Sequence, residues 1–330
     1  MFSSIYVEHD IMNHPRVSEI CRRYPNSHII ECTHYGEIFN RRSQNFRLQK
    51  NNPSLILARK NNKRVMETPI SYGLGGKNNF YFSHMLNCFY DCRYCFLQGM
   101  YRSAFYVLFV NYEDFMIDID TAIKDTNDEC YFFSGYDCDS LAFEPVSLFT
   151  ESFLPFFSRY PNSWLELRTK STQIRSLLQR DPINNCIVAY SLSPSIIADK
   201  IENKAPSLEN RLAAIQKLQM LGWRVGLRFD PIILVSDYQS LYAEFFREVF
   251  SVVNPDTLHS VTLGEFRLPT AFHANMTKLF PEEPLFGTVT QTSKNVVTYS
   301  LDTGTQLMDY CRQLVLQYVP ESQLFTQGSA

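Results

Sequence analysis

The sequence predicts a mixed α/β protein built around an open, partial (β/α)6 barrel of the TIM type. From Asn78 onward, short apolar and β-branched runs alternate with segments of helical spacing, as is typical of parallel strands joined by crossover helices. About 200 residues lie between Asn78 and Phe280, whereas a full eight-stranded barrel needs roughly 250. The chain has 330 residues and is 45% hydrophobic, which provides a large core and excludes overall disorder.

Residues 1–75 are expected to form a small N-terminal α/β lobe. The runs SIYVEHD and SHIIECT have the β-branched composition of strands, and HPRVSEICRRY between them has helical spacing. A third strand is predicted over PSLILARK.

Residues 76–280 are expected to form the barrel. Six strands are predicted, over NFYFSHML, ECYFFSG, SWLELRTK, NCIVAYSLS, WRVGLRFDPII and SVTLGEF. Before the fifth strand, LENRLAAIQKLQMLG is predicted to be a crossover helix that ends at Gly222, since glycine tolerates the left-handed conformation that often follows a helix. Residues 281–330 are expected to add a hairpin over GTVTQTSKNVVTYS and a closing helix over TQLMDYCRQLVLQYV.

Composition predicts a cytoplasmic protein with no membrane partner. No apolar run approaches the roughly 18 to 20 residues that span a bilayer, and the N-terminal MFSSIYVEHD lacks the blocks of a signal peptide. Nine cysteines, an odd number, argue against a disulfide framework in that compartment. Most are expected to be buried free thiols, namely Cys21, Cys32, Cys130, Cys186 and Cys311.

Residues 41–66 form a basic stretch in a chain whose net charge is −3. The stretch has no Asp or Glu and contains Arg41, Arg42, Arg47, Lys50, Arg59, Lys60, Lys63 and Arg64. Such a stretch is able to track nucleic-acid phosphates. The alternative is a solvated surface that balances an acidic body.

The segment NCFYDCRYCF sets Cys88, Cys92 and Cys95 in the spacing C-x3-C-x2-C, directly after the first predicted barrel strand. Barrel active sites lie at the C-terminal ends of the strands, so position and spacing both indicate a functional site. Three thiolates can hold three irons of a 4Fe–4S cluster and leave the fourth iron open to a small ligand. The alternatives are a zinc site completed by His84 and a His84 that only packs beside the strand.

The segment CFYDCRYCFLQ resembles the cluster motif of radical S-adenosylmethionine enzymes, in the version found in the spore photoproduct lyase family. The resemblance covers nearly the whole chain through YVEHD, LILARK, YVLFVNYEDF, SGYDCDSLAFE, LELRTKS, AYSLSP, APSLENRLAAIQKLQMLGW, FDPII and LGEFRLP. It implies a 4Fe–4S cluster on Cys88, Cys92 and Cys95 that binds S-adenosylmethionine. One electron, from a donor such as flavodoxin or ferredoxin, then yields a 5′-deoxyadenosyl radical that abstracts a hydrogen atom.

The resemblance also implies which strand ends hold the methionine part of the cofactor. Ser134 and Gly135, after the second strand, match the place that receives the amino group. Lys170, after the third strand, matches the lysine that binds the carboxylate. The structural alternatives are an ordinary turn and a surface lysine.

Four further positions match the family near cofactor or substrate. Ser191 matches a polar residue near the ribose or carboxylate, with a turn cap as the alternative. Tyr94 is expected over the adenine through its backbone, and it also matches a tyrosine of the family's hydrogen-atom relay. Arg228 and Asp230 project from the fifth strand end, with a buried ion pair as the alternative.

The function implied by the resemblance is DNA repair, by radical cleavage of the carbon–carbon bridge of a thymine photodimer. Three features depart from the family. The cysteine that returns a hydrogen atom falls on Gly135, and the nearest thiol is Cys138, which donates or merely packs beneath the loop. A tyrosine after the third cluster cysteine is replaced by Phe96, and the hairpin, basic in the family, offers only Lys294.

Two other functions remain open at this point. One is a related radical enzyme that acts on another nucleic acid or on a small substrate. The other is a non-enzymatic module that binds zinc or an iron–sulfur cluster.

Overall fold

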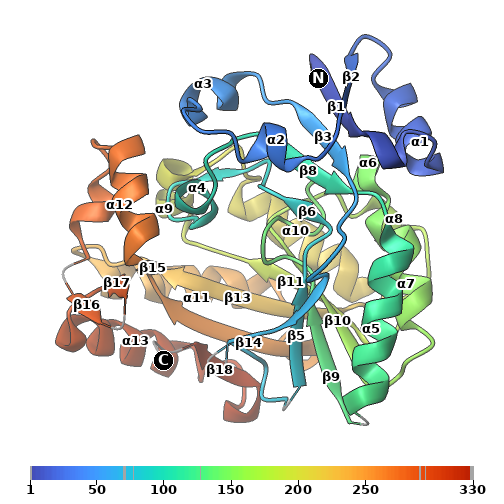
Figure 1. Ribbon diagram of the computed structural model, residues 1–330. Coiled ribbons are helices and arrows are strands. Elements are labelled where there is room, and N and C mark those ends of the chain that lie inside the picture. Colours follow the sequence, from blue (N-terminus) through green and yellow to red (C-terminus); the bar gives the residue numbers. More distant parts are fainter. Residues whose placement is uncertain are drawn as a thin grey trace.

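One eight-stranded sheet, curved into an open barrel, forms the centre of the molecule (Figure 1). The computed structural model describes residues 2–69, 72–76, 78–126, 128–289, 291–293 and 295–327. Across the sheet the strands are ordered β18-β14-β13-β11-β10-β9-β5-β4.

Six neighbouring strands are parallel, which confirms the predicted partial barrel. They are β5 (Asn78–Phe82), β9 (Cys130–Phe133), β10 (Ser163–Thr169), β11 (Cys186–Ser191), β13 (Arg224–Ile232) and β14 (Leu258–Glu265). Each lies within or overlaps one of the six predicted runs. Two edge strands were not predicted: β18 (Leu324–Gln327) runs parallel to β14, and β4 (Val65–Glu67) runs antiparallel to β5.

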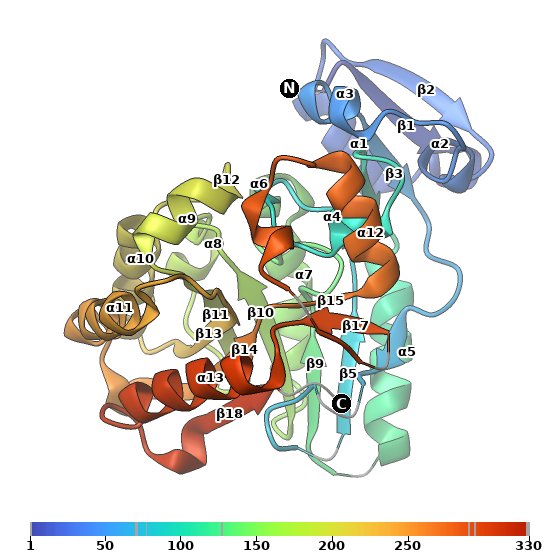
Figure 2. The same ribbon diagram turned by 90° about the vertical axis from the view of Figure 1, so that its left-hand side faces the viewer.

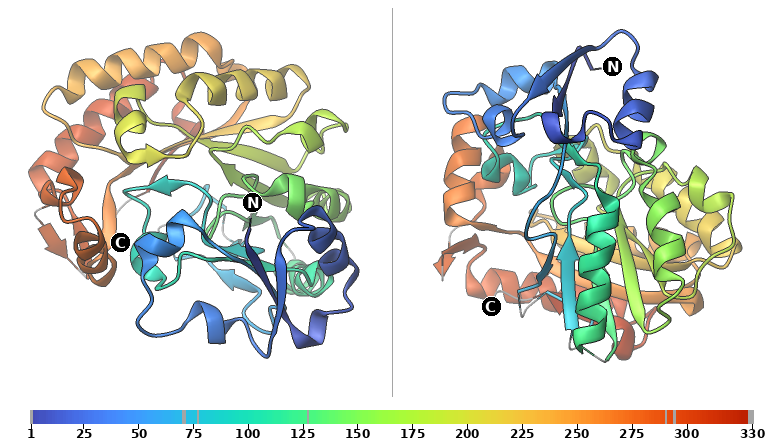
Figure 3. Two further views of the ribbon diagram at one scale, coloured as in Figure 1. Left: turned by 90° about the horizontal axis from the view of Figure 1, so that it is seen from above. Right: turned by 45° about the vertical axis from the view of Figure 1, so that its right-hand side comes forward.

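Helices follow the strands, and the longer ones cover the outer face of the sheet (Figure 3). They are α5 (Tyr112–Thr126), α6 (Glu144–Ser147), α7 (Phe149–Phe157), α8 (Arg175–Leu178), α9 (Ser195–Ile201), α10 (Leu208–Met220), α11 (Tyr238–Val252) and the 3-10 turn η2 (Pro255–Thr257). Helix α10 begins at the predicted place, where the Ser207 hydroxyl accepts from the Asn210 amide at 3.3 Å. It ends as predicted, because Gly222 follows with a φ of +87°.

The N-terminal lobe has its own sheet, ordered β2-β1-β3-β8-β6. Its elements are β1 (Ser4–Glu8), η1 (His9–Ile11), α1 (Pro15–Arg23), β2 (His28–Cys32), α2 (Gly36–Phe39), α3 (Phe46–Asn51) and β3 (Leu55–Ala58). The sheet is completed by β6 (Met85–Leu86) and β8 (Tyr106–Phe109), which come from the barrel segment. The predicted helix and all three predicted strands are present, and the boundaries at residues 75 and 280 stay predictions.

The C-terminal part contains the predicted hairpin and closing helix. Its elements are β15 (Arg267–Pro269), α12 (Thr270–Leu279), η3 (Pro284–Gly287), β16 (Gln291–Ser293), β17 (Val296–Thr298), α13 (Leu301–Val315) and η4 (Glu321–Gln323). Strands β15, β17 and β16 form a small antiparallel sheet, and α12 stands beside the short helix α4 (Leu97–Met100) (Figure 2). Lys294, the one hairpin cation, lies outside the described residues.

All nine cysteines are free. Of the five expected to be buried thiols, Cys32, Cys130, Cys186 and Cys311 are buried, whereas Cys21 is partly exposed. No helix in the described ranges is long and apolar enough to cross a membrane.

Candidate active site

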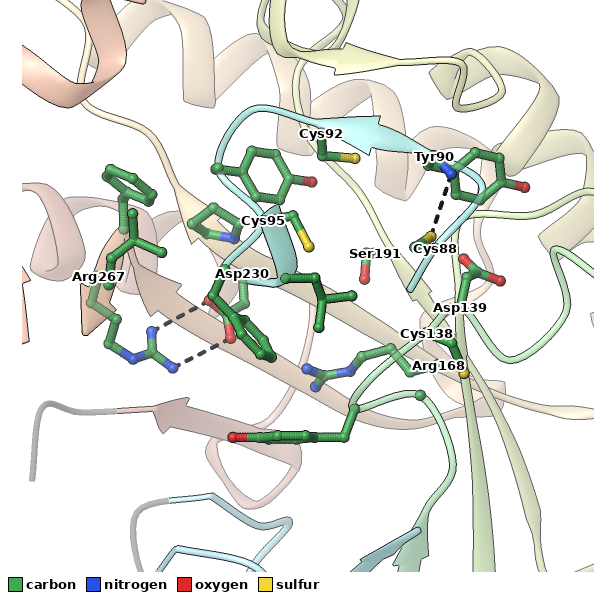
Figure 4. A pocket seen from close by; sticks show the side chains of 18 of the residues that line it. Cys88, Tyr90, Cys92, Cys95, Cys138, Asp139, Arg168, Ser191, Asp230 and Arg267 are labelled. Carbon is green, nitrogen blue, oxygen red and sulfur yellow. Dashed lines mark hydrogen bonds and ion pairs between the residues drawn. The ribbon is translucent and has the colours of Figure 1, made fainter. Parts of the chain in front are cut away.

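A cavity of about 390 Å³ opens at the C-terminal ends of the barrel strands (Figure 4). The ends of four strands contribute to its wall, through Gly135 after β9, Lys170 after β10, Ser191 in β11 and Asp230 in β13. The three cysteines of the motif line the same cavity. The structure therefore brings the cysteine loop and the strand ends together, at the place where barrel enzymes carry out chemistry.

The cysteine loop is held by backbone pairing. Strand β7 (Asp91–Cys92) pairs antiparallel with β12 (Glu202–Asn203), and the Arg93 amide donates to the Ile201 carbonyl at 2.7 Å. The Cys95 amide donates to the Cys92 carbonyl at 3.1 Å, which makes a tight turn directly before α4. These bonds fix the part of the loop that contains Cys92 and Cys95 on one wall of the cavity.

The donor set fits a cubane better than a single ion. Among the described residues, no three His, Cys, Asp or Glu side chains are arranged to hold one metal ion. The thiolates of a 4Fe–4S cube each bind a different iron, so they do not need to converge on one point. Burial raises the pKa of all three thiols, to about 12 for Cys88, so metal binding must displace their protons.

His84 lies in the core and does not contribute to the lining of the cavity. Its ring stacks on Phe149, with 4.1 Å between ring centroids. Burial lowers the pKa of His84 to about 3, so the imidazole is neutral. The sequence left His84 as either a zinc ligand or a side chain that only packs beside the strand. This geometry is that of the packed side chain.

Tyr94 is buried beside the cysteines, and its hydroxyl donates a hydrogen bond to the carboxylate of Glu202. Glu202 also forms a buried ion pair with Arg211 and accepts from the Ser193 hydroxyl at 3.1 Å. Burial alone raises the pKa of Glu202, but the cations Lys170 and Arg211 outweigh it and lower that pKa below its usual value. The Tyr94 hydroxyl is therefore occupied by a buried carboxylate.

Lys170 lies where strand β10 ends, with its ammonium 5.3 Å from the centre of the Tyr94 ring. Its amide donates to Asp139 at 2.6 Å, and the Thr169 hydroxyl donates to the same carboxylate at 2.6 Å. Burial alone lowers the pKa of Lys170, but the nearby Cys92 and Glu202 raise it on balance. The side chain thus supplies a positive charge to the cysteine end of the cavity.

Gly135 and Ser191 line the cavity, whereas Ser134 lies behind its wall. A Cβ at Gly135 would lie 2.9 Å from both the Cβ and the carbonyl oxygen of Arg168, so only glycine fits this close approach. The Ser134 hydroxyl donates to the Glu166 carbonyl at 2.8 Å. At positions 134 and 135 the cavity therefore meets the backbone of Gly135 and not the Ser134 hydroxyl.

Arg228 requires a correction. Its side chain is completely buried and does not contribute to the lining of the cavity. One guanidinium nitrogen donates to Glu166 at 2.7 Å and to the Ser260 hydroxyl at 3.0 Å, and another donates to the Ser260 carbonyl at 3.2 Å. Arg228 therefore forms the buried ion pair that the sequence left as the alternative, here with Glu166. Its donors bond within the core and do not reach the cavity.

Cys138 lines the cavity but is 6% exposed. Its sulfur lies 4.0 Å from Nδ1 of His84 and 3.8 Å from the carbonyl oxygen of Ser134. Burial raises the pKa of the thiol well above its usual value, so the sulfur keeps its proton. A neutral thiol is the form that can give up a hydrogen atom.

The half of the cavity away from the cysteines was largely missed from the sequence. It contains an aromatic and apolar wall with two arginines and one carboxylate, made by Tyr72, Phe96, Tyr136, Arg168, Asp230, Phe266, Arg267, Leu268, Phe272 and Val296. Arg267 pairs with Asp230 at 3.3 Å (Figure 4). The segments LELRTK and LGEFRLP place Arg168 and Arg267 at strand ends, which indicates that both could reach the cavity. A sequence alone does not distinguish an arginine that lines a cavity from one on the surface.

The basic stretch 41–66 is partly neutralised within the chain. Three ion pairs do this, Arg59–Asp114 at 2.8 Å, Arg64–Asp118 at 2.8 Å and Lys50–Asp91 at 3.6 Å. Four other cations of the stretch are exposed, namely Arg41, Arg42, Arg47 and Lys63. Nucleic-acid binding by this stretch stays a hypothesis.

Comparison with known proteins points in one direction. The sequence model of the family described as "Spore photoproduct lyase" matches residues 2–268. Spore photoproduct lyase of Bacillus subtilis (strain 168) is 20% identical over 265 residues, which cover 78% of this chain and 75% of that protein.

Solved structures of spore photoproduct lyase share the fold. A mutant with bound AdoMet and dinucleoside spore photoproduct superposes with a TM-score of 0.85 at 16% identity, over 100% of this chain and 99% of that one. A complex with dinucleoside spore photoproduct has a TM-score of 0.84 at 16% identity, over 99% and 98% of the two chains.

Proposed function

Because the chain belongs to the spore photoproduct lyase family, we propose that it is a radical S-adenosylmethionine lyase that repairs a thymine photolesion in DNA. One observation carries the proposal. Cys88, Cys92 and Cys95 line the same cavity as Lys170 and Gly135, at the C-terminal ends of the barrel strands. The cluster, S-adenosylmethionine and the substrate would thus bind in one cavity.

The proposed cofactors are a 4Fe–4S cluster and S-adenosylmethionine, with Cys88, Cys92 and Cys95 as the cluster ligands. When bound, this pair supplies a 5′-deoxyadenosyl radical for hydrogen-atom abstraction. The partly enclosed, largely apolar wall limits the access of water to such a radical. A one-electron donor such as flavodoxin or ferredoxin is the proposed protein partner, because formation of the radical consumes one electron.

Four residues are proposed to hold the methionine and nucleoside parts. The Lys170 ammonium binds the methionine carboxylate as a point charge. The backbone at Ser134 and Gly135 receives the amino group, since the missing side chain at Gly135 leaves room for close approach. Ser191 contacts the ribose or carboxylate from the end of β11.

Tyr94 is proposed to position the cofactor. It lies between the Lys170 ammonium and the Glu202 carboxylate, so its ring fixes the direction of the lysine. The relay role that the resemblance implies requires a free hydroxyl, whereas this hydroxyl is bonded to Glu202.

Cys138 is proposed to return a hydrogen atom to the product radical. Its S–H bond breaks and a C–H bond forms, which leaves a sulfur-centred radical. The neighbouring His84 is neutral and leaves the thiol protonated. The position at which the family has its donor is Gly135, which has no side chain to offer.

The proposal is tested with the reconstituted, reduced protein under anaerobic conditions. It is incubated with S-adenosylmethionine and DNA irradiated in the dry state, and the digest is analysed for the thymine dimer. We expect loss of the dimer in the presence of the protein and none with Cys92→Ala. Cleavage of S-adenosylmethionine without any loss of dimer would instead favour a related radical enzyme with another substrate, and Gly135 and Phe96 are the departures that point that way.

A further inference from the structure

We propose that Arg168 binds the phosphodiester that links the two nucleotides of the lesion, and thereby makes the site specific for a dinucleotide. This inference rests on the proposed function and names a contact within that site. The Arg168 side chain leaves β10 near its end, two residues before Lys170, and extends towards the side that contains Asp230 and Arg267 (Figure 4).

Arg168 is held in place by two contacts. Its Nε donates to Glu166 at 3.2 Å, and Nη1 donates to the Tyr72 hydroxyl. The guanidinium carbon also lies 5.2 Å from the centre of the Tyr72 ring. The guanidinium group of Arg168 is therefore held in one orientation before a ligand binds, which lowers the entropic cost of binding.

The remaining donors of Arg168 make no hydrogen bond within the described part of the chain, although the Asp230 carboxylate is close enough to raise the pKa of the guanidinium. A guanidinium has five N–H groups, and the two contacts above use two of them. No described residue accepts a hydrogen bond from Nη2 of Arg168. The remaining N–H groups can bind two oxygens of one anion in a bidentate way.

The other cations in the lining already have partners within the chain. Lys170 lies over Tyr94, close to Cys92 and Glu202, in the proposed cofactor half. Arg267 pairs with Asp230 at 3.3 Å. Arg168 also has a charged partner, Glu166 at 3.2 Å, but its Nη2 group makes no hydrogen bond to a described residue and lies in the substrate half.

A lesion made of two linked nucleotides brings a negative charge into this partly closed, largely apolar space. A buried anion without a partner is costly, and a fixed guanidinium offsets that cost. The two nucleosides of the lesion are joined by a single phosphodiester, which must follow the two bases into the site. The dinucleoside in the solved relatives lacks that group, so a dinucleotide can test the contact.

The experiment measures equilibrium binding to the anaerobic holoprotein, with three ligands. They are the dinucleoside lesion, the same lesion with its phosphodiester, and a short oligonucleotide whose internal linkage is a neutral methylphosphonate. We expect the wild-type protein to prefer the dinucleotide over the dinucleoside by about 10- to 100-fold, as for one charge-assisted bidentate contact. In Arg168→Gln this preference should disappear, while affinity for the dinucleoside stays the same.

Two variants serve as controls. Arg168→Lys keeps the charge but loses the fork, so it should retain only part of the preference, and it replaces Arg168→Gln if the latter does not fold. Arg224→Gln removes an exposed arginine at the start of β13, at the opposite end of the barrel, and should bind like the wild type.

Three outcomes overturn the inference. The first is equal loss of affinity for both small lesions in Arg168→Gln, which would mean that Arg168 only supports the wall. The second is a wild-type protein that shows no preference for the dinucleotide. The third is weakened binding of the methylphosphonate oligonucleotide by Arg168→Gln, which would assign the contact to a flanking phosphate. If the wild type binds no lesion at all, the proposed function fails as well, and that result is distinct from the other three.

Discussion

The hydroxyl of Tyr94 donates a hydrogen bond to the buried carboxylate of Glu202, which also forms an ion pair with Arg211. This contact links the cysteine loop to strand β12, whose backbone pairs with β7. The loop that contains the proposed cluster ligands is therefore anchored both by backbone bonds and by a side-chain hydrogen bond to the segment that follows β11.

Tyr94→Phe should destabilise the protein without changing the course of the reaction. Hydrogen bonds to charged groups contribute about 1.5 to 3 kcal/mol, and we expect a loss in that range from the free energy of unfolding in urea. The number of dimers repaired per S-adenosylmethionine cleaved should stay the same. Tyr310→Phe, which removes an exposed hydroxyl bonded to the Gln239 carbonyl, is the matched control. A fall in repairs per cleavage would instead support a relay role for Tyr94.

Much of this architecture was predictable because it depends on local patterns. The six parallel strands are short apolar runs, and their C-terminal ends can be located from the sequence alone. The cysteine spacing is equally local, so the loop from Cys88 to Cys95 was expected at the mouth of the barrel. The features that were predicted correctly, the strands and the cysteine spacing, are each determined by ten to twenty consecutive residues.

The rest depends on long-range pairing that no local window contains. Tyr94 and Glu202 are 108 positions apart, and nothing in either segment indicates the other. Strand β8 joins the N-terminal sheet although it lies within the barrel segment. Arg228 was considered for the cofactor because an arginine at a strand end looks the same whether it faces the cavity or pairs with Glu166 in the core.

Replacement of any one motif cysteine should prevent cluster assembly. Cys88→Ala, Cys92→Ala and Cys95→Ala each leave two thiolates, which expose a cube to solvent and to loss of iron. The measurement is iron and sulfide per chain after anaerobic reconstitution, together with the broad absorption near 400 nm. Cys21→Ala and Cys311→Ala should retain the full iron content. An intact cluster in any of the three motif variants would contradict the assignment.

Lys170→Ala should weaken the binding of S-adenosylmethionine. The expected loss is about 1.5 to 3 kcal/mol, the size of one hydrogen bond to a charged group. It is measured as a change in Kd on the anaerobic protein with full iron content. Lys217→Ala, on the exposed face of α10, is the matched control and should leave Kd unchanged. An unchanged Kd in Lys170→Ala would mean that the methionine carboxylate of S-adenosylmethionine binds another residue.

Glu144 should make the stability of the protein depend on pH. Burial raises the pKa of its carboxyl group from 4.5 to about 7, although Thr150 donates to it. The folded state thus holds the proton more tightly than the unfolded one, and this stabilisation is complete below pH 4.5. The free energy of unfolding should fall by up to about 3 kcal/mol between pH 4.5 and 7, and no further from this group above pH 7.

The measurement is urea unfolding between pH 4.5 and 8. Glu144→Gln should remove most of the decrease, because a neutral amide has no proton to lose. Glu244→Gln, an exposed position on α11, is the control and should keep the wild-type slope. Identical slopes in Glu144→Gln and the wild type would show that another group causes the pH dependence.

The source of the returned hydrogen atom is the point at which the chain departs most from its family. Gly135 has no side chain, while Cys138 is the thiol next along the same loop and lines the cavity. Its side chain is 6% exposed and rests near His84 and the Ser134 carbonyl, so donation requires a small movement of the loop towards the substrate. We expect Cys138→Ala to leave the cleavage of S-adenosylmethionine intact.

In the same variant, repaired thymine should fall and misquenched radical products should rise, because the product radical then has no S–H bond within reach. Tyr136→Phe is the comparison, since Tyr136 also lines the cavity and has an O–H group in this loop. Both products are measured in one digest by mass spectrometry, with deuterium from solvent-exchanged thiol as the tracer. Clean repair with undiminished deuterium transfer in Cys138→Ala, together with its loss in Tyr136→Phe, would transfer the donor role to the tyrosine.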